Sequence, residues 1–208
     1  PIRKRMYAGA NSGRLFSDFF APSNTADGEL RYSLKTLRNR SRDLYRNNSY
    51  AKRYFHVLET MVVGEKGFTV QVRGRDENGE LDAPGNKVIE NAFKRWSKIG
   101  NCDVTGRMSW LDAQRFAIQN LARDGEVFIQ KVRGGNYRDG FAIQFIESDL
   151  IDHEKNDTAP NGNEIRMGVE VDEYQRPTAY YVLTDHPDDT YFPGHQNNRK
   201  HIRIPADD

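Results

Sequence analysis

A short acidic stretch carries the residue types in this chain that are best suited to chemistry. Carboxylates close together in sequence can hold Mg²⁺, and metal-dependent nucleases use such clusters. The stretch leads into the polar segment 155–163, which contains glycine, asparagine and proline, so we favour a solvated loop. A metal-dependent DNA-processing enzyme that uses Asp149, Asp152 and Glu154 stays open as an alternative. The ionisable residues of the stretch are Glu147, Asp149, Asp152, His153 and Glu154.

Other catalytic patterns are absent from the sequence. It contains no phosphate-binding P-loop, no dinucleotide-binding glycine pattern, no nucleophile elbow and no zinc-protease helix. The five histidines are scattered, and Cys102 is the single cysteine, so no intrachain disulfide or cysteine-based metal site can form. We therefore predict that the protein is not an enzyme, and we assign it no catalytic, cofactor-binding or metal-binding residue and no cofactor.

Positive charge is concentrated near the start of a chain whose net charge is only +1. Between residues 31 and 53 the single acid is Asp43, whereas residues 147–189 are mostly acidic. A basic region and an acidic region in one chain indicate either a nucleic-acid surface, as in a monomeric nucleic-acid-binding module, or electrostatic docking between subunits. Because the net charge is near zero, we favour contacts with an acidic surface of a neighbouring subunit over contacts with DNA. The candidate contacts are Arg38, Arg40, Arg42, Arg46, Lys52 and Arg53.

The elements that position these charges follow a predicted N-terminal arm. Residues 1–30 are rich in helix-breaking residues, and we expect a flexible arm in which only the apolar run 15–20 can act as an anchor. That run could strap onto a neighbouring subunit. A helical period of apolar residues starts at Leu34, and a clearer one starts at Ala51.

A joint between these two helices is predicted from three residues that favour caps and turns. Ser49 is a suitable N-cap for the second helix. Either of the two asparagines before it can end the first helix in a left-handed conformation. The residues of this structural joint are Asn47, Asn48 and Ser49.

The sequence then predicts a strand and two more helices. Alternating apolar residues indicate a strand over 68–73, followed by a turn at 76–79. A helix is expected over about 86–98. Ser109 and Asp112 have the spacing of a capping box, and the helix that they open should reach Arg123 and stop at Gly125.

The remainder of the chain is predicted to be rich in β-structure. Residues 126–132 and 141–146 indicate one hairpin, and residues 165–172 and 177–184 indicate a second. A last short strand is expected over 201–204. Helices followed by antiparallel strands indicate the α+β class. We expect one α+β domain over 31–208, with a helical part over about 31–124 and a β-rich part over about 125–208.

The composition is polar for a self-contained globular protein of 208 residues. Hydrophobic residues make up 37%, charged residues 29%, and the mean hydropathy is −0.84. Two interpretations fit these values: a domain with long polar loops and tails, or a subunit that completes its core against copies of itself. No apolar run is long enough to span a membrane, and the basic start lacks the apolar stretch of a secretory signal. We expect a chain of a reducing compartment or of a virus particle.

Several ordered motifs resemble a known family. SRDLYRNNSYAKRY (41–54) leads into VVGEKGFTVQV (62–72), and DGEVFIQ (124–130) and FIESDLID (145–152) follow. The run IRMGVEVDEYQRPTAYYVLTDHPDD (165–189) completes the pattern. Together these motifs are similar to those of the portal proteins of lambda-like tailed bacteriophages, over about residues 31–205. Gln175 stands where that family often has glycine, so the turn there can differ in type.

The resemblance implies a fold and a function. The chain would correspond to the amino-terminal part of the portal wing, without the stem and clip helices. Portal proteins of this family form rings, typically of twelve subunits, at one vertex of the capsid. The implied partners are further copies of the subunit, the terminase, major capsid or scaffold and head-completion proteins, and double-stranded DNA that passes through. The implied location is the virion, with assembly in the host cytoplasm and no membrane.

Overall fold

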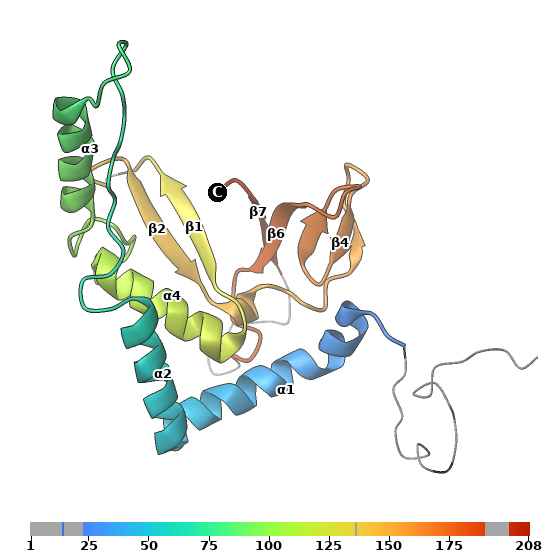
Figure 1. Ribbon diagram of the computed structural model, residues 1–208. Coiled ribbons are helices and arrows are strands. Elements are labelled where there is room, and N and C mark those ends of the chain that lie inside the picture. Colours follow the sequence, from blue (N-terminus) through green and yellow to red (C-terminus); the bar gives the residue numbers. More distant parts are fainter. Residues whose placement is uncertain (1–13, 15–22, 136, 190–199) are drawn as a thin grey trace, which may run out of the picture.

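The computed structural model describes residue 14 and residues 23–135, 137–189 and 200–208 (Figure 1). These residues form four α-helices, a two-stranded antiparallel sheet and a five-stranded antiparallel sheet. The predicted α+β class is therefore confirmed. The apolar run 15–20 lies outside the described residues. No helix in the described part of the chain has the length and apolarity that a membrane crossing requires.

Helices α1 (Ala26–Asn47) and α2 (Ser49–Val62) follow each other almost without a break. Helix α1 begins inside the segment 1–30 that the sequence predicts as an arm. The Thr25 side chain accepts a hydrogen bond from the Gly28 N–H, and two acidic residues in the first turn add to this cap.

The joint between α1 and α2 is a single extended residue, Asn48, with φ −113° and ψ 121°. Its N–H binds the Leu44 carbonyl, and its side chain accepts hydrogen bonds from the N–H groups of Tyr50 and Ala51. Two details of the prediction are wrong: Asn48, not Ser49, is the N-cap, and neither Asn47 nor Asn48 is left-handed. One residue suffices because its backbone ends one helix while its side chain caps the next.

The predicted strand over 68–73 is wrong, because no other strand pairs with this segment in the described structure. It runs extended to a turn and to helix α3 (Ala83–Trp96), which Asp82 caps. Helix α4 (Trp110–Asp124) confirms the predicted capping box of Ser109 and Asp112. It also ends as predicted at Gly125, where φ is 85°.

The β-rich part contains two sheets that α1 passes on one side (Figure 1). The first predicted hairpin is confirmed, since the strands β1 and β2 pair antiparallel in register from Phe128↔Ile146 to Arg133↔Phe141. The five-stranded sheet has the order β3-β4-β5-β6-β7. The elements are β1 (Phe128–Arg133), β2 (Phe141–Ile146), the 3₁₀ turn η3 (Ser148–Leu150), β3 (Asp157–Thr158), β4 (Glu164–Arg166), β5 (Val169–Val171), β6 (Pro177–Leu183) and β7 (His201–Pro205).

The second predicted hairpin is correct in its pairing but not in its first strand. The backbone has positive φ at Met167 (49°) and Gly168 (82°), so residues 165–172 fold into the two strands β4 and β5. A Cβ atom at Gly168 would lie 2.8 Å from the Asp152 carbonyl oxygen. Only glycine fits this turn without a shift of the backbone.

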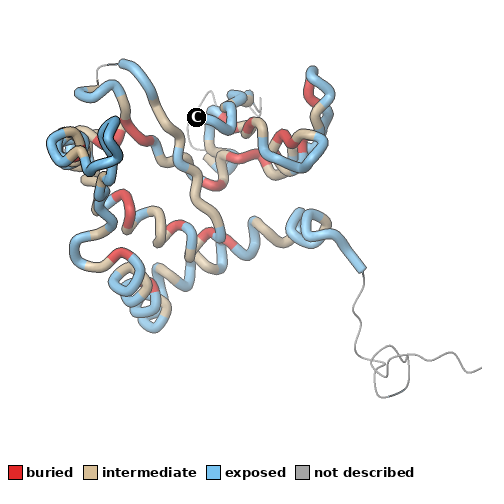
Figure 2. The backbone as a smooth tube through the Cα atoms, turned by 45° about the horizontal axis from the view of Figure 1, so that its top comes forward, coloured by how far each residue is buried: buried red, intermediate tan, exposed pale blue. Residues whose placement is uncertain are grey.

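Buried apolar side chains are unevenly distributed (Figure 2). Within helices α1 to α3 the only one is Phe55. The α4 residue Phe116 meets the β2 residue Phe145 edge to face at 4.9 Å, which joins α4 to the first sheet. The buried apolar residues from Cys102 onward are Cys102, Ala113, Ala142, Ile143, Ile151, Ala159, Ile165, Val171, Ala179, Val182 and Leu183.

Candidate functional site

A network of arginines and carboxylates joins α1 to the β-rich part. Arg38 and Arg42 lie four residues apart on α1, so their side chains leave the helix on the same face. Their partners come from the end of α4, from the start of the first hairpin and from η3. These partners are Asp124, Glu126, Ser148 and Asp149.

Arg42 binds two carboxylates at once. Its Nε lies 2.8 Å from Asp124 Oδ1 and its Nη2 lies 3.1 Å from Asp124 Oδ2, so this pair is bidentate. Its Nη1 donates to Asp149 Oδ2. Arg123 also donates to both oxygens of Asp124, at 3.0 and 2.9 Å. The carboxylate of Asp124 is therefore held by two guanidinium groups.

Arg38 is the more deeply buried of the two arginines, with 3% of its surface exposed. Its Nη1 lies 3.3 Å from both the Ser148 carbonyl and Asp149 Oδ1, and its Nη2 donates to Glu126 Oε1. Its Nε is buried without a partner among the described residues. A buried guanidinium needs such counter-charges, because burial of an unpaired charge is strongly unfavourable.

The network shifts the proton affinity of its members. Burial raises the pKa of Asp149, but the hydrogen bond and charge of Arg42 outweigh it, so the pKa lies below its ordinary value. Burial likewise raises the pKa of Asp124, and Arg123 and Arg42 bring it below the ordinary value. Burial lowers the pKa of Arg38, whereas the bond to Asp124 raises that of Arg42. Near neutral pH both carboxylates are ionised and both arginines are charged.

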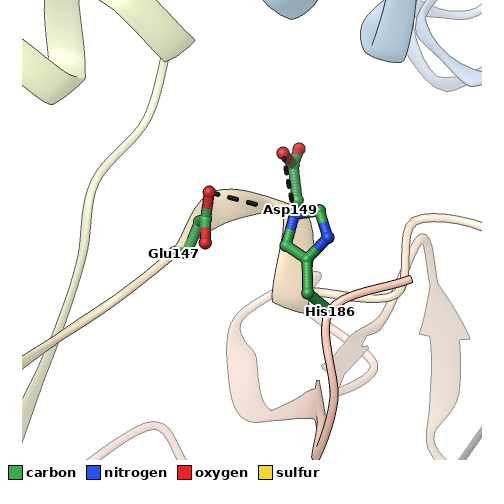
Figure 3. A group of neighbouring side chains, drawn as sticks. All are labelled: Glu147, Asp149 and His186. Atoms are coloured by element: carbon green, nitrogen blue, oxygen red, sulfur yellow. Dashed lines mark ion pairs between the residues drawn. The ribbon is translucent and has the colours of Figure 1, made fainter. Parts of the chain in front are cut away.

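One group in the described part of the chain has the geometry of a metal site: Glu147, Asp149 and His186 (Figure 3). Their ligand atoms lie within 4.8 Å of one another, and His186 Nε2 is 3.6 Å from Asp149 Oδ2 and 3.9 Å from Glu147 Oε1. The Asp149 carboxylate already binds two guanidinium groups. A divalent cation would have to displace Arg42 from Asp149 Oδ2, so this group fits an ion-pair network better than a metal.

The residues of the nuclease alternative line one small pocket, but their carboxylate oxygens do not come together at one point as metal ligands would. Asp152 Oδ2 lies 2.8 Å from His201 Nε2, and Asp152 Oδ1 accepts a hydrogen bond from the Glu154 N–H. The described residues contain no metal-ligating group that unites Asp149 with Asp152 and Glu154. Asp149 instead faces α1. The carboxylates of Asp149 and Asp152 thus have separate structural partners, the two arginines of α1 and His201.

The predicted contact residues divide into two sets. Arg38 and Arg42 bind carboxylates of their own chain, so these two basic side chains meet the acidic region within one subunit. The others are exposed and form no ion pair with a described residue. These exposed cations are Arg40, Arg46, Lys52 and Arg53.

A second network, centred on Glu170 of β5, was not predicted. Glu170 has no exposed surface, and its carboxylate binds Arg203 in a bidentate pair, with Nε–Oε2 at 2.8 Å and Nη2–Oε1 at 3.0 Å. The bonds to Arg203 hold its pKa far below its ordinary value, although burial raises it. A charged residue between two valines is typical of a solvent-facing strand position, so the sequence offered no signal. The other donors are Asn161, Asn163, Thr178 and Tyr181.

Comparison with known proteins identifies the family. Residues 12–208 match the family described as phage portal protein, lambda family. The chain is 41% identical over 210 residues to a probable portal protein of Halomonas phage phiHAP-1, and the match covers the whole chain. The chain spans 40% of the length of that relative. The resemblance predicted from the sequence motifs is confirmed: the chain belongs to the lambda family of phage portal proteins.

Proposed function

We propose that this chain forms part of the wing of a portal ring, typically of twelve subunits, at one vertex of a phage capsid. Double-stranded DNA passes through the ring during packaging and ejection. The ring docks the terminase during packaging and head-completion proteins afterwards, and capsid or scaffold proteins surround it during assembly in the host cytoplasm. The family match over residues 12–208 carries this proposal.

The distribution of apolar surface supports a subunit with neighbours. Exposed apolar side chains in α1 to α3 include Tyr50 (88% exposed), Met61 (81%) and Val88 (68%). Large exposed apolar side chains that recur along consecutive helices are typical of surfaces that other protein covers. The role that follows is structural and not enzymatic, because the charged groups of the site neutralise one another.

The exposed cations of α1 and α2 have two possible partners. We assign Arg40, Arg46, Lys52 and Arg53 to contacts with an acidic surface of a neighbouring subunit. Of the acids that are exposed in the β-rich part, Glu173 forms no ion pair with a described residue and has the required charge, whereas Glu164 already pairs with Arg166 of its own strand. A conduit benefits from weak DNA binding, because each neutralised phosphate adds affinity that resists sliding.

Ring formation tests this function directly. The protein that carries this chain, expressed at its natural length, should show rings in negative-stain electron microscopy. Charge reversal of Arg46 and Lys52 should weaken ring formation and leave DNA retention on filters at physiological salt unchanged. Unaltered rings with reduced DNA retention would assign these cations to DNA.

The nuclease alternative has its own test. Incubation of the same protein with Mg²⁺ and linear duplex DNA should give no cleavage. Mg²⁺-dependent cleavage that disappears in the Asp149→Asn variant, with rings absent, would contradict the structural role. Cleavage by such a nuclease should disappear in the Asp152→Asn variant as well, whereas Glu173→Gln, which changes an exposed acid that does not line this pocket, is the control.

A further inference from the structure

The segment 68–73 is held extended by helix side chains that take the place of a partner strand. At one end, Gln114 binds the backbone of Phe68 twice: its Oε1 lies 2.6 Å from the N–H nitrogen and its Nε2 lies 3.1 Å from the carbonyl oxygen. At the other end, Asn86 binds Gly74 in the same two-bonded way, at 2.8 and 3.1 Å. Both amide side chains are buried.

A third bond fixes the middle of the segment on the same side. Glu90 of α3 accepts a hydrogen bond from the Val72 N–H at 3.1 Å. Figure 1 shows the segment as a stretched chain that runs alongside α3. Because the backbone groups of successive residues in an extended chain point to opposite sides, these bonds define an inner edge that faces the helices.

The opposite, outer edge is open. Alternation directs the N–H and C=O groups of Thr69, Gln71 and Arg73 away from the helices. None of these groups has a hydrogen-bond partner in the described part of the chain, and all three residues are exposed. An edge of this kind is a template for pairing with another strand.

Apolar side chains accompany this open edge. Phe68 and Val70 are 58% and 46% exposed. Proline and charged side chains usually protect a strand edge from pairing with other chains. This segment contains no proline, and Arg73 is its one charged residue. The edge is also preorganised, because Gln114 and Asn86 fix the backbone before any partner arrives, which lowers the entropy lost on pairing.

We propose that the outer edge of residues 68–73 pairs with a strand of a second copy of this chain in the assembled portal. This proposal rests on the proposed function, since a ring places copies of the chain side by side. Contacts around a ring are heterologous, so each copy presents two different surfaces. The edge at 68–73 supplies one of these surfaces, and main-chain hydrogen bonds supply the recognition.

The substitution Gln71→Pro tests the pairing. In the protein at its natural length, Gln71→Pro removes one outward N–H and leaves the bonds of Phe68, Val72 and Gly74 in place. The extended residue before it suits proline. Gln71→Ala is the matched control, because it removes the side chain and keeps the N–H. Rings should form normally from Gln71→Ala, whereas Gln71→Pro should lower ring formation about tenfold or more. Equal ring formation by both variants overturns the proposal.

Hydrogen exchange of the unmodified protein provides a second test that needs no substitution. The amides of Thr69, Gln71 and Arg73 should exchange slowly in rings and rapidly in dissociated subunits. Rapid exchange in rings overturns the pairing. Slow exchange in both states also overturns it, because another part of the same chain then covers the edge. A protein that forms no rings contradicts the proposed function itself.

Discussion

The Arg38–Arg42 network and the Glu170 network use the same guanidinium–carboxylate chemistry but join different parts of the chain. The first links α1 to residues that lie 82 to 111 positions away. The second lies within one sheet, and its members come from residues 161–203. The β-rich part also contains most of the buried apolar side chains, whereas α1 contributes none.

This difference indicates two separate sources of stability. The sheet has a packed interior, and Glu170 adds buried polar bonds within it. Helix α1 has little apolar burial apart from the edge contact of Tyr45 with Phe55, so its position relative to the sheets depends mainly on the charged contacts. Damage to the Glu170 network should therefore destabilise the sheet, and damage to the Arg38 network should release α1 while the sheet stays folded.

The largest effect is expected for Glu170→Ala. Removal of Glu170 leaves its uncharged donors without their buried acceptor, whereas Arg203 is half exposed and can turn to water, so the free energy of unfolding should fall by about 3–4 kcal/mol. Urea unfolding followed by far-ultraviolet circular dichroism measures this change. The matched variant Glu170→Gln keeps the side-chain shape and should lose less. A loss below about 1 kcal/mol for Glu170→Ala would show that the Glu170 network contributes little to the stability of the sheet.

A smaller effect is expected for Arg38→Ala, about 2–3 kcal/mol, because Glu126 can reach water and Asp149 keeps Arg42. Hydrogen exchange should become faster in α1 but not in β6. The control is Arg40→Ala, an exposed neighbour on the same helix, which should change stability by no more than about 0.5 kcal/mol. Equal acceleration of exchange in α1 and β6 would show that the two parts unfold as one unit.

Acid should weaken both networks in a defined direction. The folded pKa values of Asp124, Asp149 and Glu170 lie below their ordinary values of 3.8 and 4.5. The stabilisation by these groups is complete above the ordinary values and declines as the pH falls below them, because the unfolded chain then binds more protons. Urea midpoints should be level from about pH 7 to 5.5 and fall below about pH 4.5. Glu170→Gln and Asp149→Asn should each flatten this decline; an unchanged slope in both would assign it to other carboxylates.

The smallest effect is expected for the joint between α1 and α2. Asn48→Ala removes the side-chain cap of α2 and should lower the free energy of unfolding by about 1 kcal/mol. Ser49→Ala should change it by only a few tenths, because Ser49 is not the cap. Thermal unfolding of the two variants measures the difference. A larger loss of stability for Ser49→Ala than for Asn48→Ala would show that Ser49 is the N-cap after all.

Local signals in the sequence predicted much of the fold. The capping box of Ser109 and Asp112, the stop at Gly125 and the first hairpin depend on residues close together in the chain, and all three are confirmed. The start of α1 and the strand over 68–73 were wrong. Residues 68–73 are extended, as their alternating apolar residues indicate. The hydrogen-bond partners of an extended segment are set by tertiary structure, however, and here they are the side chains of Gln114 and Asn86.

The candidate site was predictable only in part. The sequence singled out Arg38, Arg42 and Asp149 as charged residues of interest. It did not predict that both arginines bind Asp149. Pairing across such distances depends on the complete fold. Glu170 was missed for the same reason, because its four uncharged donors and Arg203 are gathered by the sheet and not by sequence spacing.

The distance in sequence between Arg38 and Asp149 sets an order of events during synthesis. The two residues are separated by 111 positions, and a ribosome adds about 5–20 residues per second. Helix α1 ends at Asn47 and is therefore complete roughly 5–20 s before Asp149, the last carboxylate partner of Arg38 and Arg42, has been made. Throughout that interval its exposed leucines, Leu37 and Leu44, are available to chaperones and to neighbouring nascent chains. A ribosome that stalls before residue 124 leaves α1 without any of its carboxylate partners.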